Sequence, residues 1–344
     1  FSSQITAGRQ PNSFIIDKHH SLKQAGCDGG EFMKQSLAGI LVLILIGSGM
    51  AMILEGCSQS ASSNYQKTIV NIPYASVSPS QKLDIYLPSE GNGPYPVIIS
   101  IHGGAYSGGD KMGPDLLMAM SALKRGYAVV SVNYRLSGEA VFPAQIHDIK
   151  AAIRFLRANA AQYNLNPNQI ACWGSSAGGQ LSALAGTSGG VKALQDPSLG
   201  NADQSDCIQA VVDWCGPINF LTMDEQFKKS GINGTLQNNP DSYTSRFMGK
   251  QITQIPEMVK KANPETYITP DDPPILIQHG TIDPLVPVQQ STDFSKKLEA
   301  VLGKSKVQTV VIQGAGHDGK GLNTPENISR VLDFLDARLK KAAY

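Results

Sequence analysis

A serine between two glycines is the first candidate for chemistry in this sequence. Ser176 stands in Gly174-Ser-Ser-Ala-Gly178, directly after the apolar run Ile170-Ala-Cys-Trp173 and before small and apolar residues that favour a helix. Strand, sharp turn and helix in this order raise the serine of a G-x-S-x-G motif above the edge of a sheet. A Cβ two residues to either side would crowd that turn, and Gly179 lets the helix approach the sheet. Ser176 is therefore the predicted nucleophile, although the motif alone also fits an ordinary Gly/Ser-rich loop.

A glycine-rich turn after an earlier apolar run can supply hydrogen-bond donors. The run at 96–102 continues into Gly103-Gly-Ala-Tyr-Ser-Gly-Gly109. Backbone N–H groups of such a turn can bind the oxygen of a reacting carbonyl. Gly104 and Ala105 are the predicted oxyanion-hole donors, completed by the N–H of Ala177. The alternative, a phosphate-binding loop, is disfavoured because no Walker lysine-Ser/Thr pair and no dinucleotide fingerprint follows.

An acid follows Ser176 later in the chain. Asp283 lies just beyond the expected strand at 275–278, and catalytic groups of open α/β sheets lie beyond the carboxyl ends of strands. Asp271 and Asp272 precede the same strand and are therefore at the wrong end. Asp283 is the predicted catalytic acid, with a turn-capping aspartate as the alternative.

A base follows the last expected strand, at 306–312. His317 lies in Gln313-Gly-Ala-Gly-His-Asp-Gly319, where glycines on both sides allow its side chain to reach over the sheet edge. His279 is a rival base, but it ends a strand beside a glycine and is interpreted as structural. His102 is interpreted as a brace for the oxyanion turn.

The chain order Ser176, Asp283, His317 is that of the α/β-hydrolase triad. In such a triad the histidine takes the serine's proton, and the acid holds the imidazole tautomer and stabilises its cation. Tyr106, just past the oxyanion turn, and Trp214, at the end of a later strand, are predicted to contact substrate. No CxxC motif or Cys/His cluster predicts a metal site.

The elements that must position these residues alternate between strands and helices. Strands are expected at 67–73, 83–87, 96–102, 127–132, 170–173, 208–214, 275–278 and 306–312, and helices at 116–124, 143–163, after Ser176, 288–302 and 324–339. This alternation predicts an α/β fold with a mostly parallel central sheet of about eight strands, flanked by helices and opened by an antiparallel pair.

A longer irregular segment, 216–274, separates two of the expected strands and is predicted to be a small cap insertion. Its middle is polar and rich in turns, which does not suit a lid for long acyl chains. Apolar residues near its start are predicted to form one wall of a small acyl pocket: Ile218, Phe220, Leu221, Met223 and Phe227. The segment therefore favours short acyl groups, from acetyl to butyryl.

The N-terminal region differs from the rest. Residues 1–32 are polar and are interpreted as an upstream or artificially added segment without order. Residues 33–57 resemble a bacterial lipoprotein signal, with a basic start, an apolar stretch and the final motif Leu54-Glu-Gly-Cys57. Cys57 is the predicted lipidation site, although Glu55 departs from the small or apolar residue usual at its position. The alternative is a transmembrane anchor. Either predicts an exported cell-envelope protein, with 58–66 as a polar tether and 67–344 as the catalytic domain.

Composition limits the partners. The chain is 41% hydrophobic and 17% charged, with a formal net charge of +1, which gives no basic excess for nucleic acid. The predicted partner is a small-molecule or carbohydrate ester, with membrane contact only through the N-terminal lipid or anchor. Cys207 and Cys215 bracket the expected strand at 208–214 and are predicted to be too far apart to form a disulfide. The oligomeric state is left open.

Four motifs resemble the hormone-sensitive-lipase and feruloyl/acetyl-esterase-like (BD-FAE-like) branch of the α/β-hydrolases: His102-Gly-Gly-Ala-Tyr106, Asn133-Tyr-Arg135, Gly174-Ser-Ser-Ala-Gly-Gly179 and His279-Gly-Thr-Ile-Asp283. The resemblance covers about residue 83 to the C-terminus and implies cofactor-free hydrolysis of carboxylic esters. Ala105 replaces the third glycine of the lipase-type loop, and Ser175 replaces the acidic residue before the nucleophile. Both departures favour the feruloyl/acetyl-esterase and arylformamidase-like neighbours.

The sequence therefore predicts a serine carboxylesterase for short-acyl esters, including acetylated or feruloylated carbohydrate. An arylformamidase and a serine peptidase of the prolyl-oligopeptidase kind are the enzymatic alternatives, although no propeller-like repeat precedes the core. A non-catalytic binding module is the third possibility. Such proteins usually lack a triad member, whereas all three residues are present here.

Overall fold

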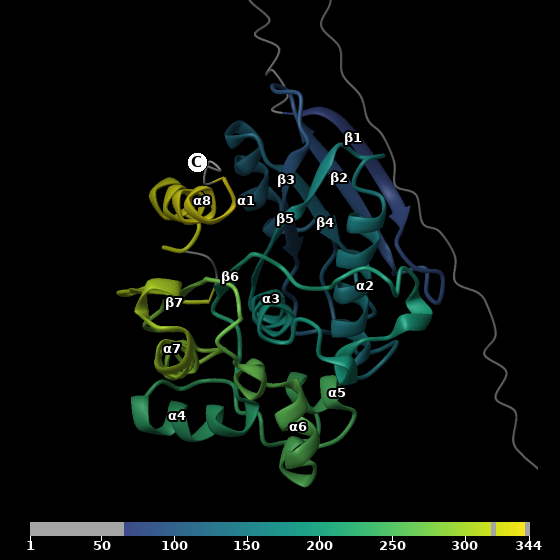
Figure 1. Ribbon diagram of the computed structural model, residues 1–344. Helices are drawn as coiled ribbons and strands as arrows, with labels where there is room; N and C mark the ends of the chain where they lie inside the picture. The colour runs from purple at the N-terminus through teal and green to yellow at the C-terminus, as the bar shows by residue number, and fades with distance from the viewer. Residues whose placement is uncertain (1–64, 318–320, 341–344) are drawn as a thin grey trace, which may run out of the picture. The chain divides into compact units, whose positions relative to one another are not determined.

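An eight-stranded sheet organises residues 65–317 and 321–340, the part of the chain that the computed structural model describes (Figure 1). The strands are β1 (Tyr65–Pro73), β2 (Lys82–Pro88), β3 (Tyr95–Ile101), β4 (Ala128–Val132), β5 (Leu165–Ser175), β6 (Ala210–Trp214), β7 (Ile275–Gly280) and β8 (Val307–Ile312). Their order in the sheet is β1-β2-β4-β3-β5-β6-β7-β8. The pairings of β1 with β2 and of β2 with β4 are antiparallel, and all the others are parallel. The predicted mostly parallel α/β sheet is confirmed.

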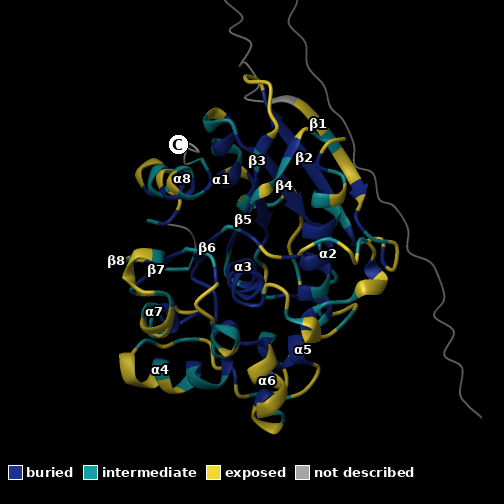
Figure 2. Cartoon of the chain, in the orientation of Figure 1, coloured by how far each residue is buried: buried dark blue, intermediate teal, exposed yellow. Residues whose placement is uncertain are grey.

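Helices cover both faces of this sheet. The helices of the main layers are α1 (Pro114–Ala119), α2 (Ala144–Ala158), α3 (Ala177–Thr187), α7 (Gln289–Leu302) and α8 (Pro325–Leu339). Side chains of α1 and α8 share one buried cluster with one set of strand residues, and side chains of α2, α3 and α7 share another cluster with the alternate set. In Figure 2, α3 and the central strands are dark blue, whereas α7 and α8 carry yellow, exposed residues.

The sequence of strand β3 is almost continuously apolar because the strand is covered on both faces. Neighbouring side chains of a strand point to opposite faces, so a strand covered on both faces needs apolar residues throughout. Ile98 packs in the cluster with α1 and α8, whereas Val97 and Ile99 pack in the cluster with α2 and α3. All three are fully buried. The strand thereby fixes the position of the glycine-rich turn that follows it.

Parallel pairing brings the loops that carry the candidate residues to one edge. Strands β3, β5, β6, β7 and β8 run in the same direction, so their carboxyl ends meet there. The glycine turn after β3, Ser176 after β5, Asp283 after β7 and His317 after β8 are therefore neighbours in space although they are far apart in sequence.

The predicted cap insertion is helical but does not form the expected pocket wall. It contains α4 (Met223–Ser230), α5 (Tyr243–Met248) and α6 (Pro256–Ala262), joined by short 3₁₀ turns. Three of the apolar residues near its start are buried in the cluster that also contains side chains of α2 and α3: Ile218, Phe220 and Met223. Phe227 is buried as well, and Leu221 is half-buried against the cluster. The prediction was wrong because an apolar cluster indicates burial, not which surface buries it.

Several sequence expectations lie outside the described residues. These are the segments 1–32 and 33–57, with Cys57, and most of the tether at 58–66, although β1 already begins at Tyr65. No helix among residues 65–317 and 321–340 has both the length and the apolar character needed to cross a bilayer.

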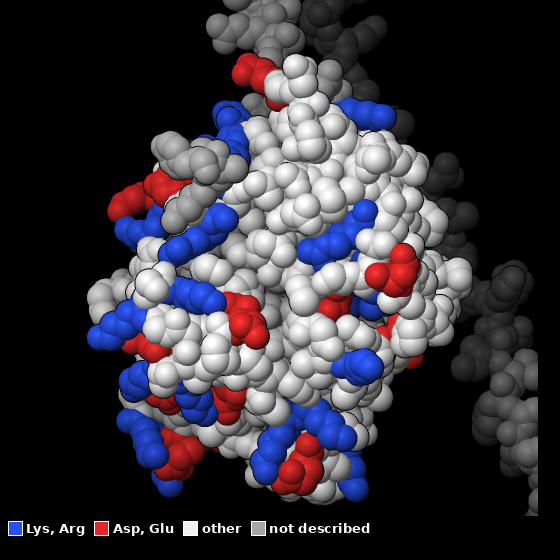
Figure 3. Space-filling model, in the orientation of Figure 1, with Lys and Arg blue, Asp and Glu red and all other residues white. Residues whose placement is uncertain are grey.

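On the face drawn in Figure 3, basic and acidic side chains are interspersed and do not gather into one basic surface.

Candidate active site

Ser176 occupies a strained turn between β5 and α3. Its φ and ψ are 55° and −121°, a conformation that costs energy for a residue with a side chain. A Cβ on Gly178 would lie 2.0 Å from the carbonyl oxygen of Ile101, and a Cβ on Gly174 would lie 2.5 Å from the Gly178 carbonyl. Both flanking glycines are therefore required by the close approach of the turn to β3, as the motif predicts.

The turn after β3 presents free backbone donors. Gly104, Ala105 and Tyr106 all have positive φ, at 109°, 54° and 59°. Within residues 65–317 and 321–340, the amides of Gly104 and Ala105 have no backbone acceptor. The N–H of Ala177 lies in the first turn of α3, where a helix leaves its amides without intrahelical partners. These are the three donors predicted for the oxyanion hole.

A carboxylate from α1 joins the two turns, and sequence reasoning missed it. One oxygen of Asp115 accepts a hydrogen bond from the Ser175 hydroxyl, and the other accepts the Gly103 N–H at 3.0 Å. Asp115 therefore connects the residue before the nucleophile to the start of the oxyanion turn. The replacement of an acidic residue by Ser175 was the available signal, because a serine there needs a partner that supplies the missing carboxylate.

Asp283 and His317 form a direct hydrogen bond, with 2.7 Å between Oδ2 and Nδ1. The other carboxylate oxygen accepts the backbone N–H groups of Leu285 at 2.8 Å and Val286 at 2.9 Å. Burial would raise the pKa of Asp283, but hydrogen bonds from His279 and His317 lower it below its usual range. The carboxylate is therefore ionised and holds the proton of His317 on Nδ1.

His279 is fully buried and already has partners for both ring nitrogens. Nδ1 lies 2.7 Å from the Ser291 hydroxyl, and Nε2 lies 2.9 Å from the Val286 carbonyl oxygen and 3.2 Å from Asp283 Oδ2. It supports the loop that carries Asp283, which agrees with its interpretation as structural. His102 donates from Nδ1 to the Gly103 carbonyl at 2.7 Å and stacks on a tyrosine ring, as expected for a brace.

His317 has a neighbour that the sequence did not suggest, the thiol of Cys215. Cys215 follows β6 with φ 46°, is 1% exposed, and its sulfur lies within 4.8 Å of a ring nitrogen of His317. Burial raises the pKa of this thiol, so it is neutral at pH 7. Burial lowers the pKa of His317, whereas the charges of a Cys215 thiolate and of Asp283 raise it above its ordinary value. Because the thiol is neutral at pH 7, the Asp283 carboxylate is the only one of these two charges present there.

Ser176 and His317 line the same pocket, of about 450 Å³, but no hydrogen bond joins their side chains in the described structure. Catalytic hydrogen bonds are often long or poorly aligned before substrate binds. The pocket's other lining residues include Met118, Leu285 and Leu322, which are apolar, and Asp110 and Asp115, which are acidic. None of the described lysines and arginines lines it.

Of the two predicted substrate contacts, only Trp214 lines this pocket. It is 1% exposed, and its indole N–H has no hydrogen-bond partner among the residues described. Tyr106 is instead fully buried and stacks on Phe247, with ring centroids 3.9 Å apart. The positive φ of Tyr106 turns its side chain from the loop into the core, so this prediction was wrong. No residue of the insertion at 216–274, all of which is described, lines the pocket either.

Comparisons with known proteins agree with this geometry. The family model described as BD-FAE matches residues 83–298. A solved truncated carbohydrate esterase from gut microbiota is 35% identical, covers 82% of this chain and 99% of its own, and has a TM-score of 0.74. The bifunctional GH43-CE protein of Bacteroides eggerthii is also 35% identical, over 78% of this chain and 35% of its own, with a TM-score of 0.71.

Among curated proteins, the esterase LipC of Mycobacterium tuberculosis is 30% identical over 243 residues, which are 70% of this chain and 57% of LipC. The chain spans about half the length of the curated relatives it matches.

Proposed function

This chain belongs to the BD-FAE family and has the α/β-hydrolase fold, and from that premise we propose that it is a serine carboxylesterase. Ser176 is the proposed nucleophile, His317 the general base and Asp283 the residue that orients the base. One observation carries the proposal: the Asp283–His317 pair lies at the same pocket as a serine held in a strained turn. A buried loop with a merely structural role has no need for that strain.

The mechanism follows from these positions. Ser176 Oγ attacks the ester carbonyl carbon while Nε2 of His317 accepts the hydroxyl proton. The N–H groups of Gly104, Ala105 and Ala177 stabilise the negative oxygen of the tetrahedral intermediate, and each donor contributes about 10²–10³ in rate. His317 then protonates the leaving alcohol, which departs and leaves an acyl-enzyme. Water repeats the cycle, releases the carboxylic acid and restores the Ser176 hydroxyl.

The lining of the pocket supports a short acyl group and a neutral, hydroxyl-rich alcohol. Met118, Leu285 and Leu322 provide apolar surface in a pocket of about 450 Å³, which must hold the acyl group and the alcohol together and therefore favours acetyl to butyryl groups. The carboxylates of Asp110 and Asp115 can accept hydrogen bonds from sugar hydroxyls, as carboxylate oxygens do. Acetylated carbohydrate is therefore the proposed natural substrate, in keeping with the carbohydrate esterase that the chain resembles.

A substrate panel tests this proposal. We expect kcat/KM for nitrophenyl esters to be highest between two and four carbons and to fall steadily towards sixteen. Acetylated sugars should be hydrolysed faster than feruloylated ones, whereas an aminoacyl amide and an N-formyl aromatic amine should not be hydrolysed. Ser176→Ala should remove about six orders of magnitude of kcat, since triad members act as a unit. A maximum at ten carbons or more, or preference for an amide, would reject the proposed substrate class.

Export as a lipoprotein is a separate proposal, supported by the lipobox-like Leu54-Glu-Gly-Cys57. In cells that process such signals, Cys57→Ser should move the protein out of the membrane fraction, because acyl chains contribute about 0.8 kcal/mol per buried CH₂ to membrane binding. If the variant keeps its full mass and stays with the membrane, the apolar stretch is a transmembrane anchor.

A further inference from the structure

Three chemically different ligand groups converge beside the proposed nucleophile. One donor atom each of Cys215, Asp283 and His317 lies within 4.8 Å of the other two. The three residues follow β6, β7 and β8, so parallel pairing brings them together although 102 positions separate the cysteine from the histidine. Sequence patterns based on close Cys and His spacing therefore had no means of finding this group.

The backbone around Cys215 directs its thiol to this place. Its N–H donates to the Gln278 carbonyl of β7 at 2.9 Å, and the carbonyl of the preceding residue, Trp214, accepts the Ser176 N–H at 2.7 Å. With its own N–H and the preceding carbonyl fixed, the residue adopts φ 46°, which is uncommon for a residue with a side chain. Cys215 and His317 both line the pocket of about 450 Å³, which gives an ion from solvent a route to them.

The donor set selects a class of ion. A thiolate, an imidazole and a carboxylate are the ligands of Zn²⁺, and the fourth position of a three-ligand zinc site stays open to water. Bonds of about 2.0 Å to nitrogen and 2.3 Å to sulfur place ligand atoms of this set about 3.3–3.6 Å apart, so separations up to 4.8 Å need side-chain shifts of about 1 Å. Mg²⁺ and Ca²⁺ prefer sets made of oxygen atoms, which this group does not offer.

The surroundings also favour a cation. Asp110 and Asp115 line the pocket, and no lysine or arginine of the described ranges does. Partial burial would raise the pKa of Asp110, but hydrogen bonds from Asn133 and the Met112 amide lower it, so it is charged at neutral pH. Carboxylates in a cleft raise the local concentration of cations.

We propose that Cys215, His317 and Asp283 form a reversible site for Zn²⁺ and other thiophilic divalent cations, and that the bound ion stops ester hydrolysis. On binding, the Cys215 thiol releases its proton to solvent and becomes a thiolate ligand. The proton that Asp283 holds on Nδ1 of His317 passes to Nε2, so that the Nδ1 lone pair beside Asp283 binds the metal. An imidazole held by the ion can no longer accept the Ser176 proton. Only this inhibitory step rests on the proposed function, because ion binding itself does not require Ser176.

Direct binding is tested on the full chain carrying Cys27→Ser and Cys57→Ser. Co²⁺ and Cd²⁺ are the probes, because their bonds to a thiolate absorb light. We expect one ion to give a thiolate charge-transfer band that Zn²⁺ abolishes by competition. Ser176→Ala should retain this band, and so should Cys207→Ser, the matched control, because that cysteine is exposed and distant in the fold. Cys215→Ala should lose the band and weaken Zn²⁺ binding at least tenfold.

Inhibition is tested on the same proteins. Zn²⁺ should inhibit hydrolysis by the parent and by Cys207→Ser, and a chelator should restore the rate, whereas Mg²⁺ should have no effect. Cys215→Ala and Cys215→Ser, each compared with its own metal-free rate, should need at least tenfold more Zn²⁺. Thermal unfolding of both variants verifies that they are folded.

The outcomes separate the two proposals. A band that survives in Cys215→Ala, or that disappears in Cys207→Ser, overturns the assigned ligands. Zn²⁺ binding without loss of activity overturns the inhibitory role. Full hydrolysis by Ser176→Ala together with a normal Cys215-dependent band would reject the proposed nucleophile and leave the metal site standing.

Discussion

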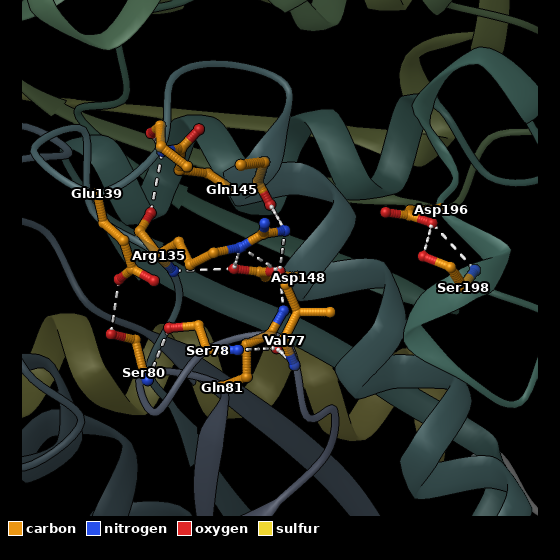
Figure 4. A network of polar contacts seen from close by, with 12 residues as sticks. Val77, Ser78, Ser80, Gln81, Arg135, Glu139, Gln145, Asp148, Asp196 and Ser198 are labelled. Atoms are coloured by element: carbon orange, nitrogen blue, oxygen red, sulfur yellow. Dashed lines mark hydrogen bonds and ion pairs between the residues drawn. The ribbon is translucent and has the colours of Figure 1, made fainter.

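Two buried polar clusters of this molecule use their hydrogen-bonding capacity in opposite ways. In the cluster around Asp148, shown in Figure 4, the carboxylate accepts from Gln81 at 2.7 Å and from the side chain and backbone N–H of Arg135 at 2.7–3.1 Å. Gln81 in turn accepts two backbone N–H groups through its side-chain oxygen. This network joins the loop before β2, the Asn133-Tyr-Arg135 segment and α2, and its central charges have partners on every side.

The pocket at Ser176 is built in the opposite way. The amides of Gly104 and Ala105 have no backbone acceptor, and the Trp214 indole N–H has no partner within the described part of the chain. Strain is concentrated here as well. Seven described residues other than glycine have positive φ; four belong to this site, and the other three are asparagines, which tolerate that conformation.

The difference shows which cluster is available for a ligand. Satisfied buried groups stabilise a unique fold, whereas unsatisfied donors cost free energy unless something else binds them. The Asp148 cluster therefore holds the chain together, and the Ser176 pocket keeps donors for a substrate. The same substitution at the two central aspartates should consequently have different effects.

Asp283→Asn should give the largest effect and should act on catalysis. The amide cannot hold the same tautomer of His317, so kcat should fall about 10⁴-fold. Steady-state kinetics with a short-acyl nitrophenyl ester measures this loss. Asp272→Asn is the matched control, because the Asp272 carboxylate accepts its hydrogen bonds from Thr269, before β7, and its kcat should stay near that of the parent. A larger loss in the control would reverse the assignment of the acid.

Asp148→Asn should act on stability instead. Asp148 is fully buried and Arg135 is 14% exposed, so the substitution leaves a largely buried guanidinium without its counter-charge. Breaking such a pair from one side costs about 3 kcal/mol of unfolding free energy. Urea unfolding should show this loss, while kcat per folded molecule stays unchanged. A catalytic loss at full stability would contradict the division between the clusters.

Asp115→Ala should produce the next largest effect, on the positioning of the oxyanion turn. Without this carboxylate, the Ser175 hydroxyl and the Gly103 N–H lose their common acceptor, and we expect kcat to fall about 10²-fold with little change in KM, as when one oxyanion donor is removed. The double variant Asp115→Ser with Ser175→Asp returns a carboxylate to the residue before the nucleophile and should recover part of kcat. An equal loss of kcat in Asp110→Asn would mean that the negative charge of the pocket, and not the positioning of the oxyanion turn, accounts for the effect.

Asp213 is intermediate between the clusters, with one oxygen bonded to the Gly216 N–H at 2.9 Å and the other without a partner in the described structure. Burial raises its pKa to about 6. The neutral carboxyl is favoured in the fold, so its contribution to stability is fully present below about pH 4 and is lost as the pH rises through 6.

Asp213→Asn should therefore stabilise the protein more at pH 7 than at pH 4, by on the order of 2 kcal/mol. Unfolding free energies of parent and variant at the two pH values provide the measurement. If the unfolding free energies of parent and variant differ by the same amount at both pH values, folding does not raise the pKa of Asp213.

Local sequence patterns predicted most of the strands and the three candidate catalytic residues. The apolar runs predicted the strands to within a few residues, with β5 extending farther, and the requirement for sharp turns identified Gly174, Ser176 and Gly178. Asp283 and His317 were predictable because parallel strands place their carboxyl ends together.

Residues whose role depends on distant partners were not predictable in this way. Asp115 contacts Ser175 across 60 positions, and Cys215 reaches His317 across 102, with no periodicity to reveal either contact. Tyr106 was misplaced because the direction of a side chain after a left-handed residue is set by the turn, not by adjacency to a functional loop.

Covalent labelling tests the central claim most directly. A fluorophosphonate reacts with a serine only where a base removes its proton and donors stabilise the resulting oxygen anion, so it reports the whole arrangement at once. Mass spectrometry of the labelled protein should show one adduct per chain, located on Ser176, absent from Ser176→Ala and formed far more slowly in His317→Ala and Asp283→Asn. An adduct on another residue, or undiminished labelling of Ser176 without His317, would contradict the account.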